Sequence, residues 1–346
     1  MEQLLQAYGL PLDASILPIT SGIINHTYRV NTSVGHFILQ QVNTQVFKAP
    51  KLIHQNIAAI DNYLKQYHPN YLLPVPLQNL DGQDLVEMPN QVYYRLFPFI
   101  ENSHTIDVVA TPDQAFEAAF QFGQFTANLN GFDANQLATT IPHFHNLTLR
   151  FEQFKTALIN GNPDRIKLAR FQINELLQFE HLVKQFEAIQ LNPQFKIRVT
   201  HHDTKISNVL FNQTDQAICV IDLDTVMPGY FISDVGDMMR TYLCPVSENE
   251  SDIDQIVVRP DYYYAIVKGY QQAMQDVLTD TEKTHFFYAG QFMIYMQALR
   301  FLTDYLNNDI YYQIQYNTHN LVRAINQIEL LNALMRYEKV FKQFSV

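Results

Sequence analysis

Short runs of alternating apolar and polar residues dominate the first hundred positions, and this period of two predicts strands. Residues 25–31 and 36–42 form two such runs, and Gly35 separates them. Two alternating runs joined by a glycine are typical of a hairpin. A short apolar run at residues 16–20 precedes this hairpin. Two further strands are expected around an Asp-Gly turn, and they end with residues 91–96.

A helical period first occurs at residues 51–67. Apolar side chains recur there at Ile53, Ile57, Ile60 and Leu64. This spacing places them on one face of a helix. Two prolines follow and end the pattern. The N-terminal region is therefore expected to contain a sheet and one amphipathic helix.

From about residue 105 onward the period is mostly helical. A strand-like segment at about residues 196–223 interrupts it, and residues 97–104 have the mixed composition of a linker. We therefore expect the α+β fold class with two lobes, an arrangement that also fits many other α+β folds. The expected domains are a β-rich N-terminal lobe at 1–96, a hinge at 97–104 and a larger, mainly helical C-terminal lobe at 105–346.

Composition adds a negative charge to this picture. The 346 residues are 47% hydrophobic and 16% charged, and the formal net charge is −11. Such a charge disfavours nucleic acid and anionic membrane surfaces as partners. It is compatible with ATP handled through Mg²⁺, because the metal supplies positive charge. We expect a small-molecule substrate, no nucleic acid and no membrane.

Three features favour the cytoplasm as the location. Cys219 and Cys244 cannot form a disulfide framework and are expected to be reduced thiols. The N-terminus lacks the basic and apolar regions of a signal peptide. The most apolar stretch, residues 286–302, is interrupted by polar residues that include Arg300, so it predicts a buried helix and not a membrane span.

The strand-like segment carries the residues that could take part in catalysis. Asp203 follows two histidines, Asn208 lies five residues later, and Asp222 ends an apolar strand. Phosphoryl transfer needs a carboxylate to orient the attacking hydroxyl and oxygen ligands to hold Mg²⁺. Asp203 suits the first task, and Asn208 with Asp222 suits the second. Taken alone, either motif could instead be a hydrogen-bonded surface cluster or a strand cap.

This set of motifs resembles the aminoglycoside phosphotransferase and choline kinase family, which has a two-lobed protein-kinase-like fold. His-x-Asp-x-x-x-x-Asn is also the spacing of the protein-kinase catalytic loop. The resemblance implies ATP and Mg²⁺ as cofactors, Asp203 as the catalytic base, and Asn208 and Asp222 as metal ligands. It further implies that His201 and Asp234 brace the catalytic loop.

Within this family, segments at 20–28, 37–43, 203–208, 221–229 and 299–306 are similar to the N-acetylhexosamine 1-kinases. That resemblance implies ATP-dependent phosphorylation of the anomeric hydroxyl of N-acetylglucosamine or N-acetylgalactosamine. It places Thr225, Arg300 and Tyr311 around the sugar. A surface ion pair between Arg300 and Asp304, which are four residues apart, is the alternative for that helix.

Nucleotide contacts are expected at two places in the N-terminal half. Gly22 and Ile24 lie in a segment that could turn over the ATP phosphates, although a hairpin glycine would look the same. Phe97 and Phe99 lie at the expected hinge, where an aromatic ring could pack near adenine or simply fill the core.

One departure from the kinase pattern concerns the phosphate-binding lysine. The strand expected to carry it has Gln40 and Gln41, and the helix at 51–67 has no glutamate to pair with it. This leaves three functions open: a sugar 1-kinase, a kinase for another alcohol such as an aminoglycoside or choline, and a nucleotide-binding pseudokinase. The presence of both Asp203 and Asp222 argues against the pseudokinase.

Overall fold

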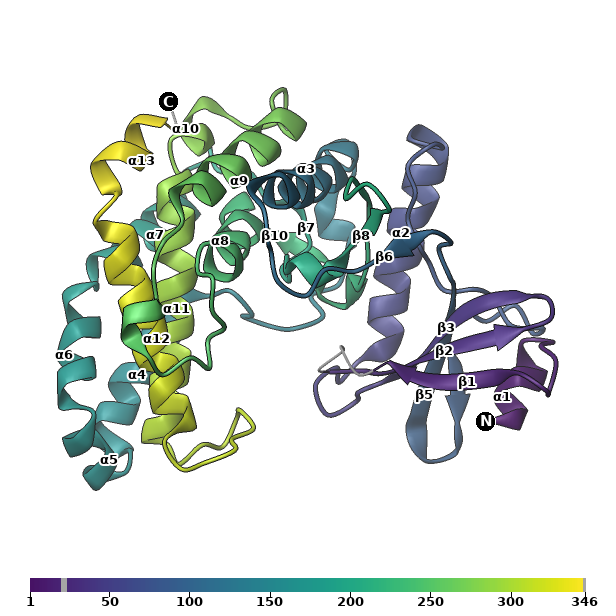
Figure 1. Cartoon of the computed structure of the whole chain (residues 1–346), viewed down its shortest axis with the longest axis horizontal. Helices are drawn as coiled ribbons and strands as arrows, with labels where there is room; N and C mark the ends of the chain where they lie inside the picture. The colour runs from purple at the N-terminus through teal and green to yellow at the C-terminus, as the bar shows by residue number, and fades with distance from the viewer. Residues whose placement is uncertain (20–23, 345–346) are drawn as a thin grey trace. The chain divides into compact units, whose positions relative to one another are not determined.

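The computed structural model describes residues 1–19 and 24–344, and these form two compact units (Figure 1). Unit 1 comprises Met1–Asp107, Asn128–Pro142 and Ser207–Pro228. Unit 2 comprises Val108–Ala127, His143–Ile206 and Gly229–Val346. Each unit is therefore built from segments that are far apart in the sequence.

Unit 1 contains a five-stranded antiparallel sheet in the order β1-β2-β3-β5-β4. In its centre, Leu39 lies opposite Leu96 and Gln40 lies opposite Arg95. The hairpin predicted around Gly35 is confirmed. The strands are β1 Ser15–Ile19, β2 His26–Thr32, β3 Gly35–Val42, β4 Val86–Met88 and β5 Val92–Pro98.

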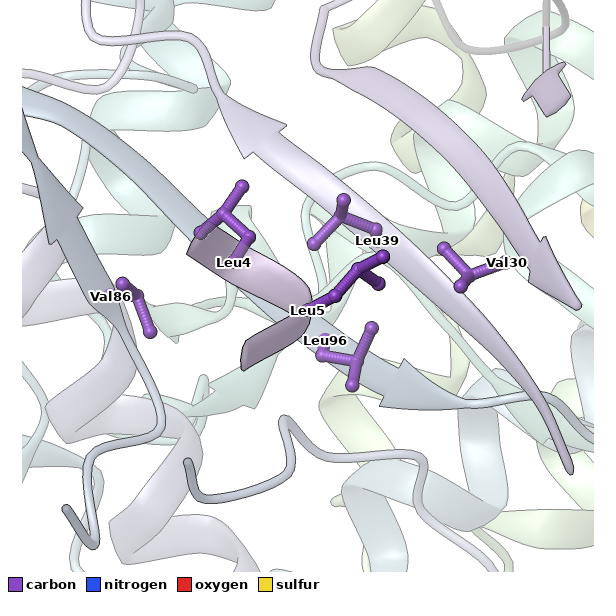
Figure 2. Close-up of a cluster of buried hydrophobic side chains, with 6 residues drawn as sticks. All are labelled: Leu4, Leu5, Val30, Leu39, Val86 and Leu96. Carbon is purple, nitrogen blue, oxygen red and sulfur yellow. The ribbon is translucent and has the colours of Figure 1, made fainter. Parts of the chain in front are cut away.

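One face of this sheet is apolar and packs against helix α1, Glu2–Ala7 (Figure 2). Because side chains alternate between the faces of a strand, the residues next to Leu39 and Leu96 point to the opposite face. Gln40 and Arg95 thus share the second face, away from the apolar cluster. That cluster consists of Leu4, Leu5, Val30, Leu39, Val86 and Leu96.

The predicted amphipathic helix is α2, Pro50–Tyr67, and its apolar positions are buried as expected. Asn56 on its buried face donates to the carbonyl oxygens of Ala138 (2.8 Å) and Val226 (3.1 Å) and accepts from the Ala138 N–H (2.8 Å). These bonds connect α2 to the turn η4, Leu223–Thr225, in the same unit.

A second, three-stranded sheet in unit 1 carries part of the predicted chemistry. Its strands are β6 Ser103–His104, β8 Val209–Asn212 and β9 Ala217–Val220, in the order β6-β8-β9. Val209 begins β8 and pairs with Val220, which ends β9. The residues just before β8 and just after β9 therefore lie close together.

Unit 2 is mainly helical, and α11, Phe286–Leu306, is its central helix. Nearly every residue of α11 is buried because α4, α8 and α12 surround it. Gly236 of α8 permits a close approach, since a Cβ there would lie 2.4 Å from the carbonyl oxygen of Ala289 on α11. Within residues 1–19 and 24–344, no helix is long and apolar enough to cross a membrane.

The other helices, short strands and turns complete the described residues. The helices are α3 Pro112–Asn128, α4 Leu147–Asn160, α5 Pro163–Leu168, α6 Arg170–Gln178, α7 His181–Leu191, α8 Phe231–Tyr242, α9 Pro260–Ala273, α10 Asp280–Lys283, α12 His319–Met335 and α13 Glu338–Phe344. The short strands and turns are β7 Arg198–Thr200, β10 Met227–Gly229, η1 Pro89–Gln91, η2 Ala134–Gln136, η3 Ile206–Asn208 and η5 Ile253–Gln255.

Candidate active site

The loop that carries Asp203 begins directly after β7 in unit 2. Asp234, in the first turn of α8, accepts hydrogen bonds from the backbone N–H groups of His201 (3.0 Å) and His202 (2.8 Å). Asp234 is completely buried. A buried carboxylate with two backbone donors fixes the path of the main chain, so the two residues before Asp203 are tied to α8.

The residue after Asp203 is tied to the same helix. The Thr204 N–H donates to Asp237 (2.9 Å), and its hydroxyl donates to the carbonyl oxygen of Asp234 (2.7 Å). The Tyr242 hydroxyl donates to the carbonyl oxygen of Thr204 (2.6 Å). The backbone on both sides of Asp203 is therefore held, while its side chain remains partly accessible at 18% exposure.

Lys205 forms an ion pair with Asp203, with its Nζ 2.9 Å from Oδ1 and 3.2 Å from Oδ2. Burial acts to lower the pKa of Lys205, but the charges of Asp203 and Asp237 outweigh it, and the net shift is upward. Lys205 is thus a cation beside the Asp203 carboxylate, and that carboxylate is the group that we expect to accept a proton.

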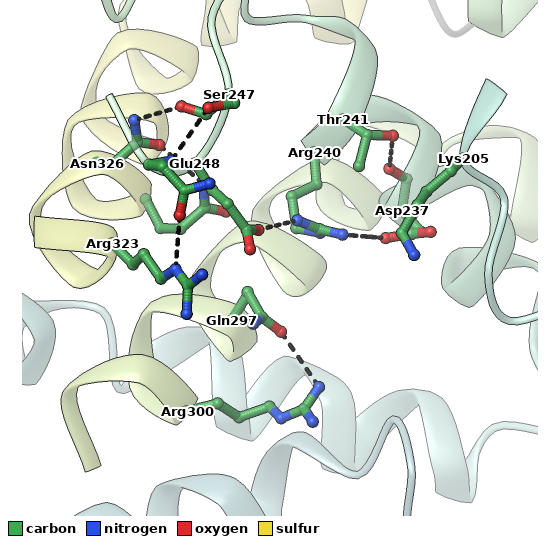
Figure 3. A network of polar contacts seen from close by, with 12 residues as sticks. Lys205, Asp237, Arg240, Thr241, Ser247, Glu248, Gln297, Arg300, Arg323 and Asn326 are labelled. Carbon is green, nitrogen blue, oxygen red and sulfur yellow. Dashed lines mark hydrogen bonds and ion pairs between the residues drawn. The ribbon is translucent and has the colours of Figure 1, made fainter. Parts of the chain in front are cut away.

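Charged side chains continue from Asp237 across unit 2 (Figure 3). Arg240 donates to Asp237 (2.9 Å) and to Glu248 (3.0 Å). Burial is the main cause that raises the pKa of Asp237, and the Arg240 charge opposes it. Burial also raises the pKa of Asp234 to about 7. The hydrogen bonds from the two backbone N–H groups act to lower this pKa, and the Asp237 charge acts to raise it.

Asn208 and Asp222, the expected metal ligands, lie together in unit 1. They flank the β8–β9 hairpin, and the Ile221 N–H donates to the carbonyl oxygen of Asn208 (2.9 Å). Asp222 has a φ of 59°, a left-handed conformation that costs energy and is common at functional sites. It begins the turn η4.

The donors of this pair fit Mg²⁺. A carboxylate and an amide supply oxygen atoms, and phosphate and water oxygens usually complete the coordination of Mg²⁺. Among the residues described, no group of three or more His, Cys, Asp or Glu side chains could hold a metal ion. The role of Asn208 and Asp222 as metal ligands remains a prediction.

Behind Asp222, unit 1 contains a buried polar cluster that the sequence did not reveal. Arg95 of β5 donates to Asp224 through Nη1 (2.5 Å) and Nη2 (2.9 Å), and to Gln40 of β3 through Nε (3.0 Å) and Nη2 (2.9 Å). Asn25 also donates to Asp224 (2.9 Å). Arg95 lies opposite Gln40 because of the register between β3 and β5. The register of two strands cannot be read from a single sequence.

Three of the four expected nucleotide residues, Ile24, Phe97 and Phe99, are in unit 1. Gly22 lies outside the described residues. The carbonyl oxygen of Ile24 accepts from the Asn43 side chain (3.1 Å). Phe97 and Phe99 are partly buried, with the guanidinium of Arg95 5.2 Å from the Phe97 ring and that of Arg29 4.3 Å from the Phe99 ring. Their contact with adenine remains a prediction.

Arg300 and Tyr311 line a cavity of about 270 Å³ in unit 2, together with Arg150 and Tyr312. The guanidinium of Arg300 lies 5.7 Å from the Tyr311 ring and 5.5 Å from the Tyr312 ring. Asp304 does not pair with Arg300, because its carboxylate accepts from the backbone N–H groups of Tyr311 (2.8 Å) and Tyr312 (2.9 Å). The alternative of a surface ion pair is therefore wrong.

Arg150 is a cavity residue that sequence reasoning missed, because nothing in its local pattern on α4 distinguishes it. Burial and then the nearby Arg300 charge lower the pKa of Arg150. Two guanidinium groups at one cavity favour a ligand with carbonyl, hydroxyl or anionic oxygens. Thr225, the third expected sugar residue, is buried in η4 of unit 1.

Residues 15–270 match the sequence profile of the phosphotransferase enzyme family, and the chain belongs to that family. It is thus a phosphotransferase with a kinase-like fold, in a family that uses ATP with a divalent metal. The predictions of fold class and of ATP as cofactor are confirmed. The narrower resemblance to N-acetylhexosamine 1-kinases remains a prediction.

Three solved structures show the same fold at low identity. An amicoumacin kinase in complex with AMP-PNP, Ca²⁺ and Ami has a TM-score of 0.61 at 15% identity, over 94% of this chain and 92% of that one. An aminoglycoside phosphotransferase from Alicyclobacillus acidocaldarius has a TM-score of 0.63 at 10% identity, over 94% of both chains. A choline/ethanolamine kinase family protein from Mesorhizobium loti has a TM-score of 0.56 at 12% identity, over 99% of this chain and 93% of that one.

Proposed function

We propose that this phosphotransferase moves the γ-phosphoryl group of ATP to the anomeric hydroxyl of a free N-acetylhexosamine, giving a sugar 1-phosphate and ADP. The observation that carries the proposal is the fixed backbone around Asp203. Asp234, Asp237 and Tyr242 hold that loop, so the Asp203 carboxylate has a defined position beside Lys205. Positioning of this kind is the main protein contribution to phosphoryl transfer.

In this proposal Asp203 orients the attacking hydroxyl and accepts its proton as the new P–O bond forms. Lys205 keeps the Asp203 carboxylate oriented. Asn208 and Asp222 would hold Mg²⁺, and the ion would supply positive charge at the phosphates. An anomeric hydroxyl is more acidic than an ordinary alcohol, so a carboxylate is a sufficient proton acceptor.

The cavity of Arg150, Arg300 and Tyr311 supports a neutral, oxygen-rich acceptor. A guanidinium fork can donate two hydrogen bonds to the oxygens of a sugar or of its N-acetyl group. A tyrosine ring can cover the apolar face of a sugar. The same two arginines disfavour a cationic acceptor such as an aminoglycoside or choline, which is the main alternative.

A pseudokinase remains the alternative from another class. Such a protein would bind nucleotide without turnover, whereas this chain retains the proposed base and both proposed metal ligands. Turnover with ATP separates the two functions directly.

The test is an ATP turnover assay across free N-acetylhexosamines, unacetylated hexoses, choline and aminoglycosides. We expect turnover with an N-acetylhexosamine, and Arg300→Ala should raise its KM by about tenfold or more with little change in the KM for ATP. Arg336→Ala, on the C-terminal side of α12 and outside the cavity, is the matched control and should leave both values unchanged. Turnover with a cationic alcohol alone would refute the sugar specificity.

A further inference from the structure

Gln40 occupies the strand position at which a kinase is expected to carry a phosphate-binding lysine. In protein kinases the lysine on the third strand contacts the phosphates and pairs with a helix glutamate. Here β3 carries Gln40 at the sheet position opposite Arg95 on β5. A cation is therefore present in the same sheet, one strand away from Gln40.

This cation has a carboxylate partner. Arg95 and Asp224 form a two-pronged ion pair, and the side chain of each is only 1% exposed. Gln40 accepts from Arg95, and Asn25 donates to Asp224. These four side chains form one connected hydrogen-bonded set, which also reaches the Thr27 hydroxyl through Gln40 (3.2 Å) and the Asn43 N–H through Asn25 (3.0 Å).

Asp224 belongs to the turn that begins at Asp222. Its side chain is bonded to Arg95 and Asn25, and its carbonyl oxygen accepts from the Thr140 hydroxyl (3.1 Å). The turn is thus fastened through both side chain and main chain, two residues after a backbone in the left-handed conformation. Such fastening restricts the backbone of the turn that begins at Asp222.

Stability alone gives little reason for such a pair. The desolvation cost of two buried charges often equals or exceeds their attraction, and apolar replacements are frequently as stable. Groups that orient metal ligands, by contrast, commonly affect metal affinity or activity by 10–100-fold.

We propose that Arg95 is a positioning residue that, through its ion pair with Asp224, fixes the Asp222 turn for metal-nucleotide binding, in place of the strand-lysine and helix-glutamate pair of other kinases. This assignment rests on the proposed function, because it requires Asp222 to be a metal ligand.

The test compares Arg95→Met with Arg95→Lys and with Arg198→Met. Arg198 forms a similarly buried pair with Glu282 (2.7 Å) in unit 2 and controls for the loss of a buried charge. The readouts are the thermal shift caused by ADP with and without Mg²⁺, the Mg²⁺ concentration for half-maximal turnover, and the KM of the acceptor.

We expect Arg95→Met to lose most of the Mg²⁺-dependent part of the ADP shift, to need about 10–100-fold more Mg²⁺, and to keep the acceptor KM. Arg95→Lys should recover part of both losses, and Arg198→Met should lower only the melting temperature. The assignment is overturned if Arg95→Met behaves like Arg198→Met, or if folded Arg95→Lys is no better than Arg95→Met. A wild-type protein with no Mg²⁺-dependent shift would overturn the proposed function as well.

Discussion

At the residue scale, Asp203 combines a rigid backbone with an accessible side chain. Its neighbours are bonded to α8, and its carboxylate is paired with Lys205 and 18% exposed. A proposed base needs this combination, because it must reach a substrate without losing its orientation.

The proposed role of Asp203 predicts a large catalytic effect without unfolding. Asp203→Asn should lower kcat by about 10²–10⁴-fold, the range for a positioned base, while ADP binding persists. Asp61→Asn, which removes an acid that is 17% exposed and paired with Lys65 on α2, is the control and should retain full turnover. Near-normal kcat in Asp203→Asn would remove this residue from the role.

The buried Asp234 predicts a specific pH dependence of stability. Its pKa is raised from 3.8 to about 7 in the folded protein, so the folded state holds this proton more tightly than the unfolded state. The stabilisation that this bound proton gives the folded state is fully present below pH 4. As the pH rises to 7 it is lost, and the free energy of unfolding falls by up to about 1.4 kcal/mol per pH unit. Chemical denaturation of the wild type and Asp234→Asn between pH 4 and 8 measures it.

The expected result is a stability advantage of the wild type over Asp234→Asn that shrinks as the pH rises toward 7. An advantage that grows over this interval would show that the carboxylate is held ionised by the His201 and His202 N–H groups instead.

At this scale the sequence offers candidate residues where the chemistry follows local spacing. Asp203, Asn208 and Asp222 could be proposed because their separation along the chain is itself a motif, and their roles remain predictions. Arg95 could not be found in this way, because its connection to Asp224 spans 129 positions and depends on sheet register.

At the element scale, α8 links the core of unit 2 to the catalytic loop. Its buried side packs on α11, and its first turns supply Asp234 and Asp237 to that loop. Any change in the α8–α11 distance should therefore affect both stability and turnover.

Gly236 tests this contact. In Gly236→Ala the new Cβ would lie 2.4 Å from the carbonyl oxygen of Ala289, and backbone cannot yield as a side chain can. Overpacking of this kind costs about 1–3 kcal/mol, and we expect a lower urea midpoint together with a lower kcat. Thr241→Ala on the partly exposed side of α8 should cost much less. An unchanged midpoint in Gly236→Ala would contradict the close packing.

The elements themselves were largely predictable. The hairpin around Gly35, the helix at 51–67 and the buried helix beginning at Phe286 follow from hydrophobic period, and all three are present as β2–β3, α2 and α11. The grouping of segments 128–142 and 207–228 with the N-terminal residues was not predictable, because it arises from contacts between distant parts of the chain.

At the scale of the whole molecule, family membership establishes a phosphotransferase, and the substrate is the remaining question. A formal charge of −11 makes the chain dependent on local cations wherever phosphate binds. In unit 1 our proposal gives that task to Mg²⁺, which Asn208 and Asp222 would hold on a turn that Arg95 would fix. In unit 2, Arg150 and Arg300 favour an acceptor rich in oxygen.

The most direct test of this account is ³¹P NMR of the product formed from ATP, Mg²⁺ and N-acetylglucosamine or N-acetylgalactosamine. We predict a phosphorus signal coupled to the anomeric proton, together with loss of the reducing end and release of ADP. A phosphorus coupled to any other sugar proton would place the transfer elsewhere and contradict the 1-kinase. Absence of transfer to either sugar, with turnover on a different alcohol, would contradict the substrate class.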